Sequence, residues 1–157
     1  MTSADCTGAN QFAYKLERGA RDALAFLTLT WLNGFCRKVK FVLYCSDVSG
    51  AFDRVRLERL LAKLRAKGVP ERWVQLFASW LRARTARVAV NGKFSEVLVL
   101  TNMVFQGTVW GPTLWNVFYE DAVLPVKGCG FTEVVFADDL NAFAEVPAAT
   151  PNDEALT

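Results

Sequence analysis

Three aspartates that adjoin apolar segments are the residues of this chain best suited to chemistry. Asp47 ends the β-branched and aromatic run 39–47, and the pair Asp138-Asp139 interrupts the apolar segment 134–143. The chain contains no histidine, so it lacks the usual general base, a histidine-activated nucleophile and the commonest zinc ligand. Any chemistry must therefore depend on carboxylates.

The residues around Asp138-Asp139 predict a rigid acidic turn. By itself, an Asp-Asp pair is more typical of an ordinary solvent-facing turn. Here the residues before it (134–136) and after it (140–143) are mostly apolar, so we expect two buried strands joined at the pair. If the strand that ends at Asp47 is a neighbour, three carboxylates converge and repel one another unless a divalent cation is present. Such hard oxygen ligands suit magnesium.

Periodicity predicts an α+β fold, with an antiparallel sheet backed by helices. The apolar run 39–47 is interpreted as a central strand that is covered on both faces. Asn91-Gly92 is a strong hairpin signal within 85–100, and Asp53 is interpreted as the N-cap of the next helix. We expect helices over 21–32 with a stop at Asn33-Gly34, over 55–67, from Pro70 onward and over 113–123, and a strand, turn and strand over 131–143.

The charges are distributed unevenly along the chain. Residues 54–87 hold ten Lys or Arg and two Glu, whereas residues 88–157 hold two Lys and nine acidic residues, within a net charge of +2. One segment is thus suited to face a polyanion and the other to concentrate carboxylates, as a metal-dependent nucleic-acid enzyme requires. The alternative is that the basic residues form the solvated face of helices.

Neither a membrane span nor a secretory signal is recognisable in the sequence. The longest apolar stretch, 23–32, is short and interrupted by threonine, and residues 1–10 lack a basic segment followed by an apolar run. We therefore expect an intracellular protein, nuclear or cytoplasmic, that does not insert into membranes and is not secreted.

Four segments carry motifs in a recognisable order. They are QFAYKLERGARDAL from Gln11, CSDVSGAFDRV around Asp47, Gln106-Gly107 followed by Gly111-Pro112, and Phe136-Ala137-Asp138-Asp139. The first resembles the fingers-to-palm segment of reverse transcriptases of the non-LTR retrotransposon and group II intron type. The others resemble the family's palm motifs, with Phe136 where the family usually has tyrosine. Together and in this order the motifs are specific.

The resemblance implies RNA-directed DNA synthesis within a polymerase palm. The partners would be an RNA template, a DNA primer and dNTPs, and the cofactors would be two Mg²⁺ ions, with Mn²⁺ as a substitute. Asp47 and Asp138 would be the main metal ligands, and Asp139 a weaker or supporting one. All three would then be catalytic residues of a nucleotidyl transfer to the primer 3′-hydroxyl.

The resemblance also implies a substrate pocket. The ring of Phe52 would leave no space for a ribose 2′-hydroxyl and so select dNTPs, while Gln106 and Gly107 would line the nucleotide and template pocket. From spacing alone, Phe52 is more simply a core residue on the helix that follows, and Gln106-Gly107 is compatible with an ordinary loop.

The resemblance divides the chain into three parts. We expect a mobile N-terminus (1–10), partial fingers plus palm (11–146) and a mobile tail (147–157). The missing fingers and thumb elements would be supplied by a longer parent protein. The alternative function is a non-catalytic retroelement remnant or RNA-binding module, with the basic segment 54–87 as its surface.

Overall fold

A computed structural model of the chain describes residues 8–101 and 104–156, so most of the predicted mobile N-terminus lies outside the described residues. The chain forms two compact units, the first made of residues 1–49 and 119–157 and the second of residues 50–118. None of the helices formed by the described residues has the length and apolar composition needed to cross a bilayer.

The first unit is built on a three-stranded antiparallel sheet with the order β1-β7-β6. Its strands are β1 (Val39–Ser46), β6 (Thr132–Phe136) and β7 (Asp139–Pro147). The α+β class with an antiparallel sheet is therefore confirmed, as is the strand, turn and strand over 131–143. The prediction that 39–47 is a central, doubly covered strand is wrong, because β7 is central and Leu43 and Tyr44 of β1 are about half exposed.

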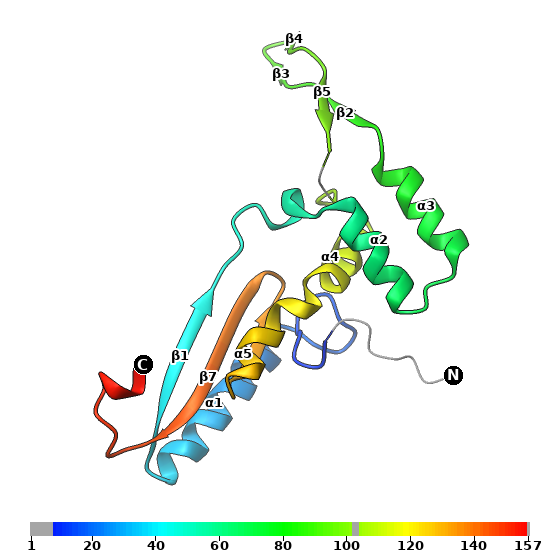
Figure 1. Ribbon diagram of the computed structural model, residues 1–157. Helices are drawn as coiled ribbons and strands as arrows, with labels where there is room; N and C mark the ends of the chain where they lie inside the picture. The colour runs from blue at the N-terminus through cyan, green and yellow to red at the C-terminus, as the bar shows by residue number, and fades with distance from the viewer. Residues whose placement is uncertain (1–7, 102–103, 157) are drawn as a thin grey trace. The chain divides into compact units, whose positions relative to one another are not determined.

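The helix α1 (Ala20–Cys36) covers one face of this sheet (Figure 1). Phe143 of β7 and Val134 of β6 are buried in a cluster on this face, together with Phe12 before the helix. Trp31 of α1 packs edge-on against Phe143, with 6.3 Å between ring centroids. Aromatic pairs of this kind add to stability beyond the area they bury. The contact therefore holds α1 against the central strand β7.

The predicted helix stop at Asn33-Gly34 is wrong, since α1 continues to Cys36. Gly34 is buried, and a Cβ atom at this position would lie 2.3 Å from Cζ of Phe41 on β1. The glycine therefore permits close contact between helix and strand rather than ending the helix.

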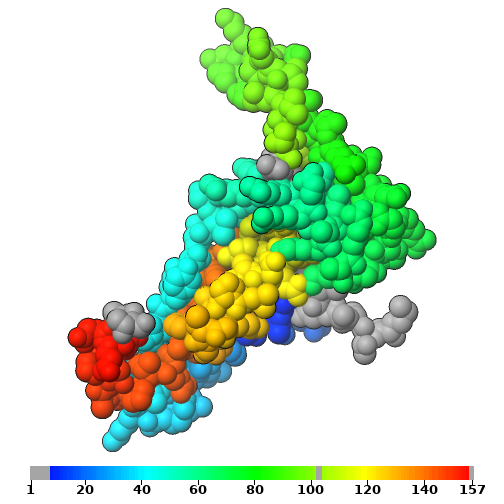
Figure 2. Space-filling view, in the orientation of Figure 1, coloured from blue at the N-terminus to red at the C-terminus, as the bar shows by residue number. Residues whose placement is uncertain are grey.

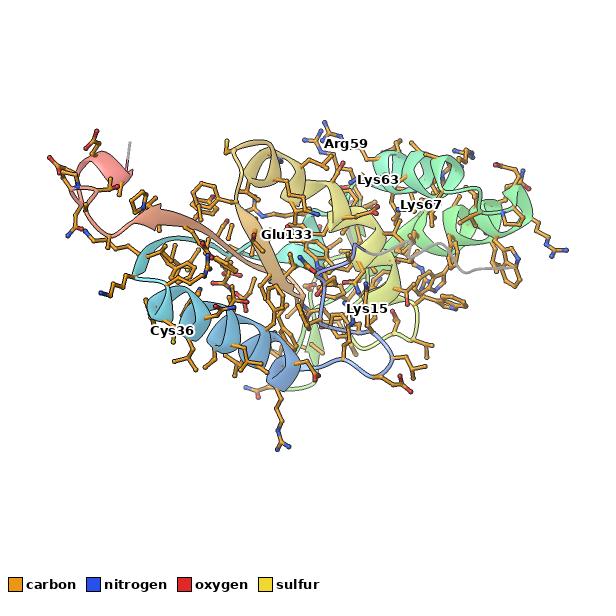
Figure 3. The ribbon with its side chains drawn as sticks, turned by 90° about the horizontal axis from the view of Figure 1, so that it is seen from below. Lys15, Cys36, Arg59, Lys63, Lys67 and Glu133 are labelled. Carbon is orange, nitrogen blue, oxygen red and sulfur yellow. The ribbon has the colours of Figure 1, made fainter. Side chains whose placement is uncertain are left out.

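The helix α5 (Leu124–Gly128), which follows the 3₁₀ turn η2 (Glu120–Val123), contacts β6 and covers the other face of the sheet. Glu133 of β6 is labelled in Figure 3, and its buried carboxylate pairs with Lys127 of α5 at 2.6 Å. A buried acid needs such a partner. A cavity of about 200 Å³ is lined by Tyr44 of β1 and by Pro125, Val126, Cys129 and Phe131.

The segment that follows β7 lies against the first strand. After β7 the backbone turns at Pro147 and reaches the 3₁₀ turn η3 (Glu154–Leu156). The ammonium group of Lys40 on β1 donates to the carbonyl of Thr150 (2.9 Å) and to the side chain of Asn152 (3.2 Å). Figure 2 shows these C-terminal residues in red, beside the end of β7.

The second unit contains helices and two small two-stranded sheets. Its elements are η1 (Ala51–Arg54), α2 (Leu57–Ala66), α3 (Glu71–Leu81), β2 (Arg84–Ala86), β3 (Ala89–Val90), β4 (Lys93–Phe94), β5 (Leu98–Leu100) and most of α4 (Gly111–Tyr119). Asn91 and Gly92 both have positive φ and join β3 to β4, which confirms the predicted hairpin. Asp53 lies inside η1, and α2 begins after Arg56 without a side-chain cap, so the N-cap prediction for Asp53 is wrong.

Candidate active site

The register of the sheet brings the predicted catalytic aspartates to one end of it. Ser46, the last residue of β1, pairs with Leu140 of β7. One residue beyond each of these partners come Asp47 and Asp139, and Asp138 lies in the turn between β6 and β7. Antiparallel partners have Cα atoms about 4.5–5.5 Å apart. The three aspartates therefore lie at the same end of the sheet in the first unit.

The turn that carries Asp138 has only two residues, because Phe136 pairs directly with Asp139. Its first residue, Ala137, has φ +59° and is buried. A non-glycine residue with positive φ is strained, so the surrounding structure must hold it. Asp138 is half-buried, whereas Asp139 and Asp47 are exposed.

The charges of all three aspartates act on Tyr119, which is half-buried. Burial raises the pKa of this phenol above its ordinary value, and the neighbouring Asp138, Tyr44, Asp47 and Asp139 raise it further. A phenol with a raised pKa stays protonated at neutral pH and retains its O–H donor. The sequence predicts a helix around Tyr119 but no role for it, because Asp47 and Asp138 lie in other elements.

The oxygen atoms of the three carboxylates are suitable ligands for a divalent cation. Within residues 8–101 and 104–156, no set of three or more His, Cys, Asp or Glu side chains is arranged to hold a metal ion. Magnesium, however, is usually bound through one or two carboxylates, several waters and the substrate's phosphates. Asp47 and Asp138, with Asp139 beside them, supply donors of that kind.

The predicted substrate residues lie in the second unit. Phe52 on η1 is buried and stacks on Trp115 of α4, with ring centroids 5.5 Å apart. The carbonyl of Phe52 accepts a hydrogen bond from the N–H of Val104 (2.9 Å), at the start of the loop that contains Gln106 and Gly107. Phe52 is a core residue, as predicted, but it lies on η1 and not on the helix that follows. Its role as a sugar gate stays a prediction.

The loop is described from Val104 to Trp110, with Gln106 and Gly107 exposed in a turn. Gly107 has φ +78°, a conformation that glycine adopts without steric cost. The hydroxyl of Thr108 donates to the carbonyl of Phe105 (2.7 Å), and this hydrogen bond across the turn stabilises it. The structure thus brings Phe52 together with this loop inside the second unit, and the three aspartates together inside the first.

Comparison with known proteins shows the family to which the chain belongs. Residues 8–153 match the family of reverse transcriptases (RNA-dependent DNA polymerases). The chain belongs to this family. The match confirms the resemblance found in the motifs, and it extends over both units.

Relatives of this reverse transcriptase domain come from mobile elements. The chain is 33% identical over 124 residues to the RNA-directed DNA polymerase from mobile element jockey of Drosophila melanogaster, a match that covers 77% of this chain and 13% of that protein. The jockey polymerase of Drosophila funebris is 30% identical over 166 residues, covering 99% of this chain and 18% of that protein. The retrovirus-related Pol polyprotein from the type-1 retrotransposable element R2 of Popillia japonica is 25% identical, covering 71% of this chain and 20% of that protein.

A solved structure supports the fold. Apo telomerase from Candida tropicalis, truncated from its C-terminal domain, matches with a TM-score of 0.63 and 14% identity, covering 88% of this chain and 30% of that one. The likeness confirms a partial reverse transcriptase palm and fingers fold. The chain therefore has the fold of such a domain and spans a fifth or less of the length of the curated relatives named above.

Proposed function

We propose that this chain is the catalytic palm of an RNA-directed DNA polymerase, which extends a DNA primer on an RNA template with dNTPs. The observation that carries the proposal is the placement of Asp47, Asp138 and Asp139 at one end of an antiparallel sheet, in a chain of the reverse transcriptase family. We also propose that the protein is intracellular, and that a longer parent protein supplies the fingers and thumb elements. The polymerase activity of that whole protein belongs to the same proposal.

In this proposal Asp47 and Asp138 hold two Mg²⁺ ions, with Asp139 in support and Mn²⁺ as a substitute. When bound, the ions supply Lewis-acid activation of the primer hydroxyl and neutralise charge on the triphosphate. The chain's own contribution is positioning, since it has no histidine to act as a general base. Tyr119, with its raised pKa, keeps a proton beside the carboxylates and offers a hydrogen-bond donor there.

Phe52, Gln106 and Gly107 are proposed to bind the incoming nucleotide. The support is that Phe52 is held against Trp115 and is hydrogen-bonded to the start of the Gln106-Gly107 loop. A ring packed on one side by tryptophan cannot turn away, which is what exclusion of a ribose 2′-hydroxyl requires.

Primer extension tests the proposal. The purified 157-residue chain would be given an RNA template, a labelled DNA primer, dNTPs and Mg²⁺, and compared with Asp138→Asn and with Asp153→Asn. Asp153 is exposed and follows Asn152, which contacts Lys40 at the other end of β1 from Asp47. We expect extension by the wild type and by Asp153→Asn, and a loss of about 10²–10³-fold in Asp138→Asn, as for removal of one group that stabilises charge in the transition state. Extension that persists in Asp138→Asn would overturn the assignment of the site.

The basic face of α2 favours one second candidate, a module that binds RNA without catalysis. Arg59, Lys63 and Lys67 follow one another at helical spacing on α2 and its C-terminal end, and Figure 3 labels them. Arg59 is exposed, whereas Lys63 is half-buried and donates to the carbonyl of Phe118. RNA binding that weakens steeply with salt and is unchanged in Asp138→Asn, without primer extension by either form, would favour this candidate.

A further inference from the structure

The side chain of Gln11 is bonded to the turn that carries the catalytic aspartates. Its Oε1 accepts hydrogen bonds from the backbone N–H of Ala137 (3.0 Å) and of Ala13 (2.9 Å). Its Nε2 donates to the carbonyl of Ala137 (3.1 Å). One amide therefore satisfies both backbone groups of Ala137, the residue directly before Asp138.

Gln11 is itself fixed by its surroundings. It is only 4% exposed, and its backbone segment lies beside β6 as a parallel bridge. The N–H of Phe12 donates to the carbonyl of Val135 (2.9 Å), and the N–H of Val135 donates to the carbonyl of Asn10 (3.0 Å). The buried side-chain amide makes three hydrogen bonds, and the residues before and after Gln11 are hydrogen-bonded to β6, so Gln11 has little freedom to move.

Ala137 needs such a partner. Its φ of +59° is unfavourable for a residue with a Cβ atom, and its peptide groups are buried in a two-residue turn. A buried backbone group without a partner is costly. The bonds from Gln11 therefore favour the strained conformation over relaxed turns, which would point Asp138 and Asp139 in other directions.

We propose that Gln11 is a positioning residue of the polymerase site, which acts by holding Ala137 so that Asp138 and Asp139 stay at the end of the sheet. This inference rests on the proposed function. Partners that orient a ligand without touching the metal or the substrate typically change metal affinity or activity by about 10–100-fold when they are removed. The contact joins residues far apart in sequence, so the motif around Gln11 gave no sign of it.

The test compares Gln11→Met with Glu133→Gln in the full chain. Methionine keeps the approximate volume of glutamine and removes all three hydrogen bonds. Glu133→Gln weakens a buried ion pair elsewhere on β6, so it lowers stability without touching the turn. Each variant is first compared with the wild type by urea unfolding, so that effects on stability are known.

Three measurements separate positioning from a purely structural role. We expect hydrogen exchange at the amide of Ala137 to be about ten-fold faster in Gln11→Met than in Glu133→Gln, because its acceptor is lost. We expect the Mn²⁺ concentration that broadens the amide signals of Asp138 and Asp139 to rise about ten-fold in Gln11→Met alone. The primer-extension rate at saturating dNTP should fall by a similar factor, with the KM for dNTP little changed.

The outcomes are distinct for the two proposals. If the wild type binds Mn²⁺ at Asp138 but does not extend primers, the polymerase proposal fails while the exchange and Mn²⁺ measurements still decide the role of Gln11. If Gln11→Met and Glu133→Gln change all three readouts equally, or if Mn²⁺ never broadens these signals, the positioning proposal is overturned. Should Gln11→Met fail to fold, Gln11→Asn provides the same test, since its side chain stays polar but its amide is one methylene too short to keep both hydrogen bonds to Ala137.

Discussion

Replacing Gly34 with alanine tests the close contact between α1 and β1. In an open helix interior this change stabilises by about 1 kcal/mol, because alanine loses less backbone entropy than glycine. Here the new methyl would lie 2.3 Å and 2.5 Å from two ring carbons of Phe41, and 3.0 Å from Cγ2 of Val39. The ring is packed against Trp31, Phe35 and Phe143 and cannot swing aside freely.

Overpacking of this kind costs about 1–3 kcal/mol, and the confined ring favours the upper part of that range. After the gain in helix propensity, we expect Gly34→Ala to lower the free energy of unfolding by about 1–2 kcal/mol. For a domain of this size that corresponds to a fall in melting temperature of about 2–8 °C. Thermal unfolding followed by circular dichroism measures it.

Gly128→Ala is the matched control, since a Cβ atom at that position would meet nothing within 4 Å. We expect this variant to be as stable as the wild type or slightly more stable. Adding Phe41→Leu to Gly34→Ala should restore part of the loss, because contacting residues couple by about 0.5–3 kcal/mol. If Gly34→Ala matched or exceeded the stability of the wild type, the contact would not be as tight as described, and the reasoning would be refuted.

Three further predictions concern charge and substrate selection. Asp138→Asn should lower the pKa of Tyr119 while leaving it above the ordinary value, because burial is the larger cause; NMR titration of the Tyr119 ring carbons measures this, and an unchanged pKa would contradict it. Arg65 holds the pKa of Glu71 below its ordinary value, so this pair stabilises the fold above the unfolded-state pKa of Glu71. The contribution is lost as the pH falls through the folded-state pKa. Glu71→Gln should therefore have a lower urea midpoint than the wild type at pH 7, and the two midpoints should converge in acid. Phe52→Val should raise the ratio of rNTP to dNTP incorporation by about ten-fold or more, and an unchanged ratio would remove Phe52 from substrate selection.

Local chemistry explains the parts of the structure that the sequence predicts. Asn91-Gly92 and the acidic turn at Asp138 are specified by the residues at the turn and the strands directly beside them. The helix that became α2 is specified by its apolar face, and Gly68 follows it with positive φ. In each case the residues that decide the conformation are neighbours in the chain.

The parts that sequence analysis missed depend on distant partners. Gly34 was interpreted as a helix stop because its contact with Phe41 is invisible without the fold. The apolar run before Asp47 looks like a central strand, but the strand order places it at an edge. Gln11 is hydrogen-bonded to Ala137 across most of the chain, and Tyr119 lies near aspartates that belong to other elements. No local pattern encodes such contacts.

The pairing of β1 with β7 has a consequence for how the protein folds. The β6–β7 hairpin is local and can form within microseconds, so the turn that carries Asp138 and Asp139 forms early. Joining β1 to β7 instead closes a loop that contains the whole of residues 50–118. During synthesis, β1 must wait until β7 has left the ribosome, about 100 residues later. We therefore expect the acidic site to be completed last, in a slow step set by the topology of the sheet.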